Sequence, residues 1–356
     1  MVSAFEPGSA RHPLATKEGW RSFVSQTQPM PPQLLAESDW RRLDEIERDI
    51  YDDARRDYHA ELLLVATPEI RQITTVGAKL TVNNRGKQLG RRGLIVSGPS
   101  GTGKSTSITQ LGKRHQVELE RKSPGVTDRI PVVYIIVPPA ATPKMLAVEM
   151  ANFLGLPVNN HDSQHSITQA VVGVLRAVRC SLVLVDEVHR LDLRTRTGSA
   201  ASDQLKYFFD CIGATFVYAG LDLEANGLFS GTRGRQIAGR FITLHTSAFQ
   251  YATAPQRQNW ARVVATMEES LRLHHHTTGT LVALASYLHR RTGGMIGSLD
   301  QLIYEAANDA ITDGTEKITK KHLDTVILDT AAQAQYDPPA PRRPRTAGVR
   351  ASGGTP

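Results

Sequence analysis

A glycine-rich segment at residues 98–105 has the residue types and the spacing of a loop that binds a chain of phosphates. It reads Gly-Pro-Ser-Gly-Thr-Gly-Lys-Ser, which fits the pattern G-x-x-x-x-G-K-[ST]. An apolar run at 94–96 precedes it, and a helical pattern containing Ile108 and Leu111 follows it. This strand-to-helix context argues against the alternative, a glycine-rich turn that matches the pattern by chance.

Each residue type in this segment has a role in nucleotide chemistry. Glycines let backbone N–H groups face the phosphates, and the start of the following helix adds a favourable dipole. We expect Lys104 to reach the β and γ phosphates of ATP and the Ser105 hydroxyl to ligate Mg²⁺. The predicted nucleotide-binding residues are Gly98, Pro99, Ser100, Gly101, Thr102, Gly103, Lys104, Ser105 and Thr106.

Two adjacent carboxylates, Asp186 and Glu187, follow the apolar run 182–185. Ligands of open α/β sheets bind at the carboxyl ends of the strands. We therefore expect Asp186 to hold Mg²⁺ through water, and Glu187 to be catalytic by orienting or deprotonating the attacking water. By themselves two such acids could form a solvated turn, but they follow a phosphate-binding loop, which favours the catalytic interpretation.

Three arginines, Arg233, Arg235 and Arg240, precede another apolar run at 241–244. An arginine in this position can stabilise transition-state charge on the nucleotide of a neighbouring subunit. Solvated surface arginines are the alternative. We take Arg240 as the catalytic candidate and the other two as substitutes for it.

Two further clusters are interpreted as structural. Adjacent histidines cannot all face one ion, so the triplet at 274–276 is expected to be an exposed helix end and not a metal site. The basic residues after the phosphate-binding segment are expected to form a solvated helix face; they are Lys113, Arg114, Arg121 and Lys122.

Short apolar runs alternate with helical patterns over the middle of the chain, which predicts a doubly wound parallel α/β sheet. The predicted strands are 94–96, 132–137, 182–185, 216–218 and 241–244. The remainder is helical or irregular. We expect a flexible arm at 1–33, helices at 34–84, an ATPase core at 85–250, a helical lid at 251–331 and a disordered basic tail at 332–356.

The predicted N-terminal helices have specific signals. Trp40, Leu43, Ile46 and Ile50 recur at spacings of three and four, which places them on one face of a predicted helix that runs to about Tyr58. A second helix is predicted to begin with Thr67 as N-cap and Pro68 at its first position. In the lid, helices are predicted to start near Pro255 and to cover 281–288 and 299–306.

The composition is compatible with a polyanionic partner. Lys and Arg total 42 against 35 Asp and Glu, a formal charge of +7 in 356 residues. The two cysteines, Cys180 and Cys211, suggest neither a disulfide framework nor a metal site. Without an apolar run long enough to span a bilayer, the chain is expected to be cytoplasmic and soluble, with no membrane partner.

With both nucleotide motifs placed, the chain resembles an AAA+ ATPase, and more narrowly the TniB/TnsC family of transposition regulators, over about residues 35–330. The residues that carry the resemblance are GPSGTGKST at 98–106, VDEVHRL at 185–191, VYAG at 217–220, GRF at 239–241 and GGMIGSLDQLIYEAA at 293–307.

The resemblance implies a function. Such proteins assemble as homo-oligomers on double-stranded DNA with ATP and Mg²⁺, recruit a transposase to the target, and use hydrolysis to dismantle or remodel the assembly. It places Arg240 at the arginine-finger position, and Thr142 and Lys144 where relatives present residues to DNA.

Two positions depart from the AAA+ pattern. Leu221, followed by Asp222, stands where a polar sensor is common, and Gly297-Ser298 stands where the lid often has an arginine. We therefore expect weak coupling of the lid to nucleotide and slow turnover. Other AAA+ classes, such as origin-recognition or helicase-loader proteins, and P-loop signalling ATPases of phage defence are the alternatives. The first should carry a winged-helix domain after the lid and the second an effector domain, and neither is expected here.

Overall fold

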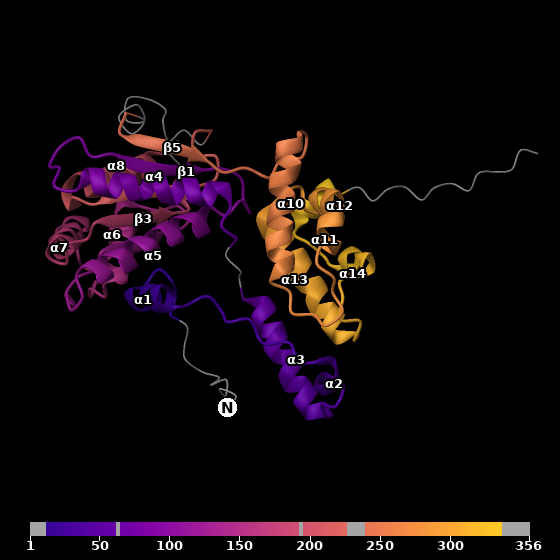
Figure 1. The fold of residues 1–356 in the computed structure, drawn as a ribbon. Coiled ribbons are helices and arrows are strands. Elements are labelled where there is room, and N and C mark those ends of the chain that lie inside the picture. Colours follow the sequence, from indigo (N-terminus) through magenta and orange to yellow (C-terminus); the bar gives the residue numbers. More distant parts are fainter. Residues whose placement is uncertain (1–11, 62–64, 192–194, 226–238, 337–356) are drawn as a thin grey trace, which may run out of the picture.

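The computed structural model describes residues 12–61, 65–191, 195–225 and 239–336 (Figure 1). Arg233, Arg235 and the arginines predicted for the basic tail lie outside these ranges. The described chain forms a sheet covered by helices and, beside it, a smaller unit of helices alone (Figure 1). Within these ranges no helix is both long enough and apolar enough to cross a membrane.

The sheet has five parallel strands in the order β2-β3-β4-β1-β5. The strands are β1 (Gly93–Ser97), β2 (Val132–Ile136), β3 (Leu182–Asp186), β4 (Thr215–Gly220) and β5 (Phe241–His245). All five predicted strands and the predicted α/β class are thereby confirmed. Because every strand points the same way, the segments that follow β1, β3 and β4 emerge at one edge of the sheet.

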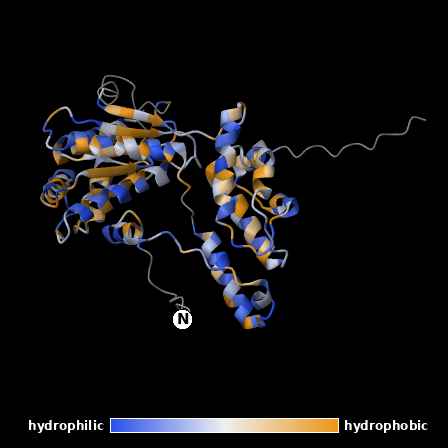
Figure 2. Ribbon diagram, viewed as in Figure 1, coloured by the Kyte–Doolittle hydropathy of each residue, from blue (hydrophilic) through white to orange (hydrophobic). Residues whose placement is uncertain are grey.

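Helices cover the sheet, and the strands between them are almost entirely apolar (Figure 2). Every residue of β1, β3 and β4 is buried, as expected for strands covered on both faces. The covering helices are α4 (Pro68–Asn84), α5 (Lys104–Lys122), α6 (Pro143–Leu154), α7 (Gln164–Ala177) and α8 (Arg196–Ile212). As predicted, Thr67 caps α4, its side chain accepting a hydrogen bond from Ile70 N.

The helical unit packs around Trp260, which is fully buried and donates its indole N–H to the Ala285 carbonyl over 2.8 Å. Its helices are α10 (Ala254–Glu269), α11 (Thr280–Ala283), α12 (Ala285–Thr292), α13 (Ile296–Thr312), α14 (Lys320–Thr325) and α15 (Thr330–Gln335). The predicted start near Pro255 is confirmed, and the predicted helix over 281–288 is divided into α11 and α12. The first residues of the predicted tail belong to α15, where Ala332 is buried.

The predicted arm at 1–33 is wrong for α1 (Lys17–Ser25), which packs on the helix-covered sheet. Trp20 is only 2% exposed and donates from Nε1 to Gln116 Oε1 over 2.8 Å. Lys113 Nζ donates to the Phe23 carbonyl at the end of α1 over 2.9 Å. The prediction of a solvated face is therefore wrong at Lys113, which ties α1 to α5.

The single helix predicted to run to about Tyr58 is also wrong. The segment forms two helices, α2 (Glu37–Trp40) and α3 (Glu45–Ala60). Trp40 is buried, whereas Ile46 and Ile50 are 72% and 55% exposed. The buried face of α3 instead carries Arg55, whose guanidinium donates to both carboxylate oxygens of Glu316 over 2.7 and 2.8 Å. This buried ion pair docks α3 on the helical unit, whereas α4 packs against α5.

The histidine triplet does not form an exposed helix end. It lies in the loop after α10, where His274 stacks on Trp40 with ring centroids 4.4 Å apart. His276 is nearly buried and lies 3.0 Å from the Glu268 carboxylate. The triplet therefore has a packing role that joins the lid loop to α2.

Candidate nucleotide-binding site

The glycine-rich segment joins the end of β1 to the start of α5, as its sequence predicts. Gly101 and Gly103 have φ values of +74° and +80°, which are unfavourable for residues with a side chain. At Gly98 a Cβ atom would lie 2.1 Å from the Thr246 carbonyl oxygen. Two of these glycines are therefore required by backbone conformation and the third by a close contact.

Lys104 opens α5 and is 8% exposed, with its ammonium group bonded to the Pro99 carbonyl. Burial lowers the pKa of Lys104, while the nearby charges of Asp186, Glu187 and Asp222 act in the opposite direction. The Ser105 hydroxyl makes no hydrogen bond within the described ranges. The Ser105 hydroxyl is therefore free to bind a ligand, and Lys104 can do so by exchanging its one backbone hydrogen bond.

Asp186 ends β3 as a buried carboxylate with fixed orientation. Its Oδ2 accepts a hydrogen bond from the Tyr134 hydroxyl over 3.0 Å, and its Oδ1 accepts one from Glu187 N over 2.8 Å. Burial and the neighbouring Asp186 charge hold the pKa of Tyr134 above its ordinary value, so the hydroxyl remains a donor. A carboxylate held in this way is a suitable ligand for a hard cation or for its water shell.

Glu187 takes a left-handed backbone conformation, with φ of +59°, before the short helix η1 (Val188–Arg190). Its Oε2 lies 3.1 Å from Arg190 Nε and 3.5 Å from His189 Nε2. Leu221 N donates to His189 Nδ1 over 3.2 Å, which leaves the imidazole proton on Nε2, toward Glu187. His189 and Arg190 had no predicted role, although they follow Glu187 by two and three residues.

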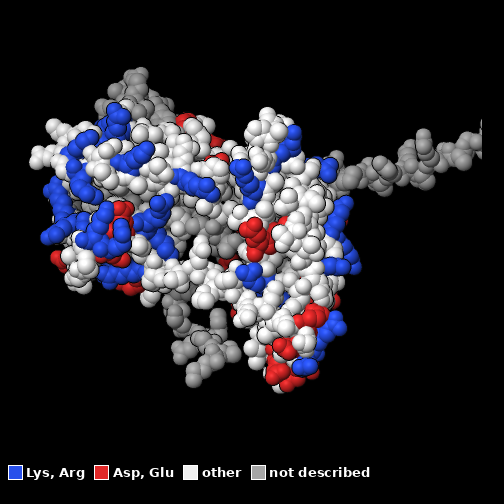
Figure 3. Space-filling model, in the orientation of Figure 1, with Lys and Arg blue, Asp and Glu red and all other residues white. Residues whose placement is uncertain are grey.

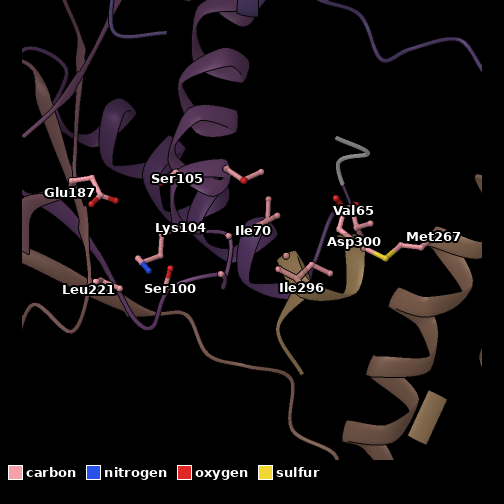
Figure 4. A pocket seen from close by; sticks show the side chains of 14 residues that line it. Val65, Ile70, Ser100, Lys104, Ser105, Glu187, Leu221, Met267, Ile296 and Asp300 are labelled. Atoms are coloured by element: carbon pink, nitrogen blue, oxygen red, sulfur yellow. The ribbon is translucent and has the colours of Figure 1, made fainter. Parts of the chain in front are cut away.

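Lys104, Ser105 and Glu187 line a cavity of about 340 Å³ between the core and the helical unit, and Asp186 lies outside its lining (Figure 4). Figure 4 shows Ser100, Lys104 and Glu187 toward one end and Val65, Met267 and Asp300 toward the other. The lining residues are Val65, Ile70, Ser100, Gly101, Gly103, Lys104, Ser105, Thr106, Glu187, Leu221, Met267, Ile296, Gly297 and Asp300. The cavity thus has a polar end at the glycine-rich loop and a largely apolar end at the lid.

The start of α13 touches the glycine-rich loop directly. Gly297 N donates to the Gly101 carbonyl over 3.3 Å, and a Cβ atom on Gly103 would lie 3.9 Å from Ile296 Cγ2. The position where many AAA+ proteins have an arginine is therefore in backbone contact with the loop. Three other predicted loop residues do not line the cavity: Gly98, Pro99 and Thr102. Thr102 Oγ1 lies 2.7 Å from Thr246 Oγ1, a contact that holds the loop in place.

Arg240 lies away from this cavity. It precedes β5, and Phe241 is in register with Gly93 at the amino end of β1, whereas the glycine-rich loop follows the carboxyl end. The five residues of β5 span about 16 Å, and this length of strand separates Arg240 from the end of the sheet that carries the glycine-rich loop. Arg240 Nη1 donates to Asp210 Oδ1 over 2.7 Å, and its guanidinium lies over the Phe209 ring, 4.6 Å from the centroid.

Thr142 and Lys144 lie at the start of α6, after the carboxyl end of β2. The Thr142 hydroxyl caps this helix by accepting from Met145 N over 3.1 Å, and Lys144 Nζ donates to the Asn160 carbonyl over 3.2 Å. Neither residue lines the nucleotide cavity. Both have structural contacts, and their predicted contact with DNA stays a prediction.

The fold and the site define the chain as a P-loop protein with the AAA+ fold. A family model described as "Bacterial TniB protein" matches residues 57–251, which is more than half of the 356-residue chain. The chain belongs to the TniB family. No curated protein matches it.

Solved structures with a similar fold include origin-recognition proteins. The Aeropyrum pernix ORC1 protein in complex with DNA has 20% identity and a TM-score of 0.54, over 78% of this chain and 67% of that one. The Aeropyrum pernix ORC2 protein, as ADPNP and ADP complexes, has 15% identity and a TM-score of 0.57, over 74% and 69%. Drosophila ORC bound to DNA has 15% identity and a TM-score of 0.53, over 85% and 70%. At these identities the likeness concerns the fold alone.

Proposed function

We propose that this TniB-family chain is an ATPase that assembles on double-stranded DNA and recruits or regulates a transposase. The observation that carries the ATPase proposal is that Lys104, Ser105 and Glu187 line one cavity although Glu187 comes from a separate strand. A phosphate-binding loop, a cation ligand and a carboxylate base are the parts that phosphoryl transfer to water requires.

The residues present fit ATP and Mg²⁺. Lys104 Nζ would leave the Pro99 carbonyl for phosphate oxygens, and its positive charge would balance theirs. Ser105 and Asp186 would hold Mg²⁺, which supplies shielding of the phosphate charge when bound. Glu187 would orient the attacking water and take its proton. Val65, Ile70, Met267 and Ile296 provide the apolar surfaces that a nucleotide base packs against.

A second subunit would complete the site. Arg240 lies at the opposite edge of the sheet from its own glycine-rich loop, so it can act only on the nucleotide of a neighbouring copy. This arrangement supports a ring or a helical filament, because a head-to-tail contact repeats from copy to copy.

The distribution of charge supports a polyanionic partner such as DNA. Lys and Arg gather over the core, whereas Asp and Glu gather at the end formed by α2 and α3 (Figure 3). Exposed basic residues of α4, α5 and their ends include Arg71, Lys79, Arg85, Lys87, Arg114, Arg121 and Lys122. Positive charge of this kind binds duplex phosphates without regard to sequence. Membership of the TniB family, together with the resemblance to transposition regulators, supports the transposase as the protein partner.

The ATPase proposal is tested by measuring phosphate release from MgATP with and without duplex DNA. We expect slow release that DNA stimulates, with Glu187→Gln binding ATP but not hydrolysing it and Lys104→Ala failing to bind. Hydrolysis by Glu187→Gln at the parent rate would show that Glu187 does not activate water. Normal ATP affinity in Lys104→Ala would contradict the proposed phosphate contact.

An origin-recognition or helicase-loading role is the second candidate, since DNA-bound origin-recognition proteins share the fold. The two roles differ in their protein partner. Insertion of a transposon in a reconstituted reaction with the transposase, dependent on this protein and ATP, supports the first. Loading of a replicative helicase without any effect on insertion would support the second.

A further inference from the structure

The helix α1 lies beside α5, the helix that follows the phosphate-binding loop (Figure 1). Its buried side chain Trp20 is bonded through Nε1 to Gln116 of α5. A glycine makes room for the indole, because a Cβ atom on Gly112 would lie 2.7 Å from Trp20 Cη2 and 2.8 Å from Leu184 Cδ1. Trp20 therefore fills a close-packed position between α5 and β3, the strand that ends in Asp186.

Trp20 is connected to the proposed metal ligand Asp186 through one further ring. Its indole stacks on the Tyr134 ring, with centroids 6.0 Å apart and an angle of 22° between the planes. The Tyr134 hydroxyl in turn donates to Asp186 Oδ2 over 3.0 Å. All three side chains are buried. A continuous set of contacts thus runs from α1 through β2 to the carboxylate at the end of β3.

A second cavity, of about 620 Å³, places α1 beside the start of α5. Ser105 and Tyr134 lie on its lining, together with Phe23 of α1 and the segment 26–29 that follows α1. Ser105 and Asp186 are the two proposed Mg²⁺ ligands. The ring that holds Asp186 therefore lies on the same cavity as the other ligand.

The hydrogen bond from Tyr134 is important because a metal-binding carboxylate needs a fixed orientation. Asp186 Oδ1 accepts from Glu187 N over 2.8 Å, and the Tyr134 hydroxyl holds Oδ2. Loss of the hydroxyl would leave one oxygen of a buried carboxylate without its donor. Removal of such an outer partner commonly costs about ten- to hundredfold in metal affinity. The hydroxyl stays in place only if its ring does, and Trp20 packs against that ring.

We propose that Trp20 of α1 positions Tyr134, and through it Asp186, for the binding of Mg²⁺ with the nucleotide. The inference rests on the nucleotide-binding function proposed above. It makes Trp20 and Tyr134 positioning residues, since neither is proposed to contact the nucleotide or the metal. It also gives α1 a role at the site, because displacement of α1 from α5 would remove the support of a metal ligand.

The test is calorimetric titration of the full chain with a non-hydrolysable ATP analogue, first without Mg²⁺ and then with it. The wild-type chain should bind more tightly with Mg²⁺, and this gain in affinity is the readout. Tyr134→Phe, which removes only the hydroxyl, should reduce the gain by about tenfold, or abolish a smaller one. Affinity without Mg²⁺ should stay unchanged, because Asp186 is proposed to act on the nucleotide only through the metal. A purely structural role would lower both affinities.

Variants of Trp20 test the second step. Trp20→Leu removes the ring that stacks on Tyr134 and should also reduce the gain. Trp20→Phe is the matched control: it likewise loses the bond to Gln116, but it keeps an aromatic ring and should keep most of the gain. The double variant of Trp20→Leu with Tyr134→Phe should lose no more than Tyr134→Phe alone, since Trp20 acts through Tyr134.

Thermal melting checks that each variant is folded. If Trp20→Leu does not fold, Gly112→Ala takes its place, because the added methyl group displaces the indole, and the same reduction is expected. An undiminished gain in Tyr134→Phe would overturn the proposal. Equal losses in Trp20→Leu and Trp20→Phe, or losses that add in the double variant, would do so as well.

Two results with the wild-type chain separate this inference from the function on which it rests. Binding of the analogue without any gain from Mg²⁺ would overturn the inference and leave nucleotide binding intact. Failure to bind the analogue under either condition would contradict the proposed nucleotide-binding function itself.

Discussion

Arg190 Nε lies 3.1 Å from Glu187 Oε2, so the proposed catalytic carboxylate is ion-paired within its own subunit. The same guanidinium donates from Nη1 to the Val137 carbonyl at the end of β2 over 3.2 Å, which fixes the arginine to the sheet. Arg190 therefore restrains the carboxylate that is proposed to orient the attacking water. We expect the release of this pair to accompany activation.

Arg190→Gln should raise hydrolysis in the absence of DNA by up to about fivefold, because a partly exposed ion pair contributes at most about 1 kcal/mol. ATP affinity should stay unchanged, since Arg190 does not line the cavity. Initial rates of phosphate release at saturating ATP provide the measurement. A fall in rate to the level of Glu187→Gln would mean that Arg190 positions the carboxylate for catalysis.

Arg240 should act in trans. Alone, Arg240→Ala and Lys104→Ala should each be inactive, the first for lack of an arginine finger and the second for lack of ATP binding. In a mixture, some interfaces pair an intact cavity with an intact Arg240, so part of the DNA-stimulated ATPase activity should return. Absence of recovery in mixtures that crosslink together would leave Arg240 with its structural contacts to Asp210 and Phe209.

Stability should fall as the pH drops from 6.5 toward 4. Burial lowers the pKa of His59 to about 4, and the same cause lowers that of His115 to about 4. Each imidazole has a pKa near 6.5 when unfolded, so the unfolded chain binds more protons in this window. Their contribution is complete above pH 6.5, and each histidine should reduce the free energy of unfolding by up to about 1.4 kcal/mol per pH unit below it.

Urea unfolding between pH 7.5 and 4.5 measures this slope. Burial keeps His59 neutral, against the opposing effect of the hydrogen bond from its Nδ1 to Asn308 Oδ1 over 3.3 Å; its Nε2 accepts from Arg272 N over 3.0 Å. His59 and His115 contribute about equally to the slope of the unfolding free energy against pH. His59→Gln should therefore remove about half of their joint contribution to this slope. An identical slope in the variant and the wild type would show that His59 does not titrate during unfolding.

The parts of the fold that the sequence predicts correctly are those with local signals. The glycine-rich loop and the buried strands are each encoded by a few consecutive residues. The capping side chain of Thr67 accepts a hydrogen bond from Ile70 N, only three residues away. The buried face of α3 has no local signal, because its determinant lies far away in the sequence. Arg55 is buried against Glu316, which is 261 residues away in sequence, and this pair outweighs the spacing of Ile46 and Ile50.

The candidate site shows the same difference between local sequence signals and non-local packing. Lys104, Ser105, Asp186 and Glu187 stand in recognisable motifs, and the structure places Lys104, Ser105 and Glu187 around one cavity. The apolar end of the cavity has no local signal, because Val65, Met267 and Ile296 come from the segment before α4, from α10 and from α13. Only the packing of these distant elements brings the three side chains together.

The most direct measurement of the central claim is the mass of complexes that Glu187→Gln forms on duplex DNA with MgATP and with MgADP. We expect multi-subunit complexes that accumulate with ATP, because hydrolysis cannot dismantle them, and that are absent with ADP. Adding Arg240→Ala to this variant should prevent ordered assembly while leaving ATP bound. Equal assembly with ATP and ADP, or monomers on DNA under both conditions, would contradict the claim that ATP controls assembly on DNA.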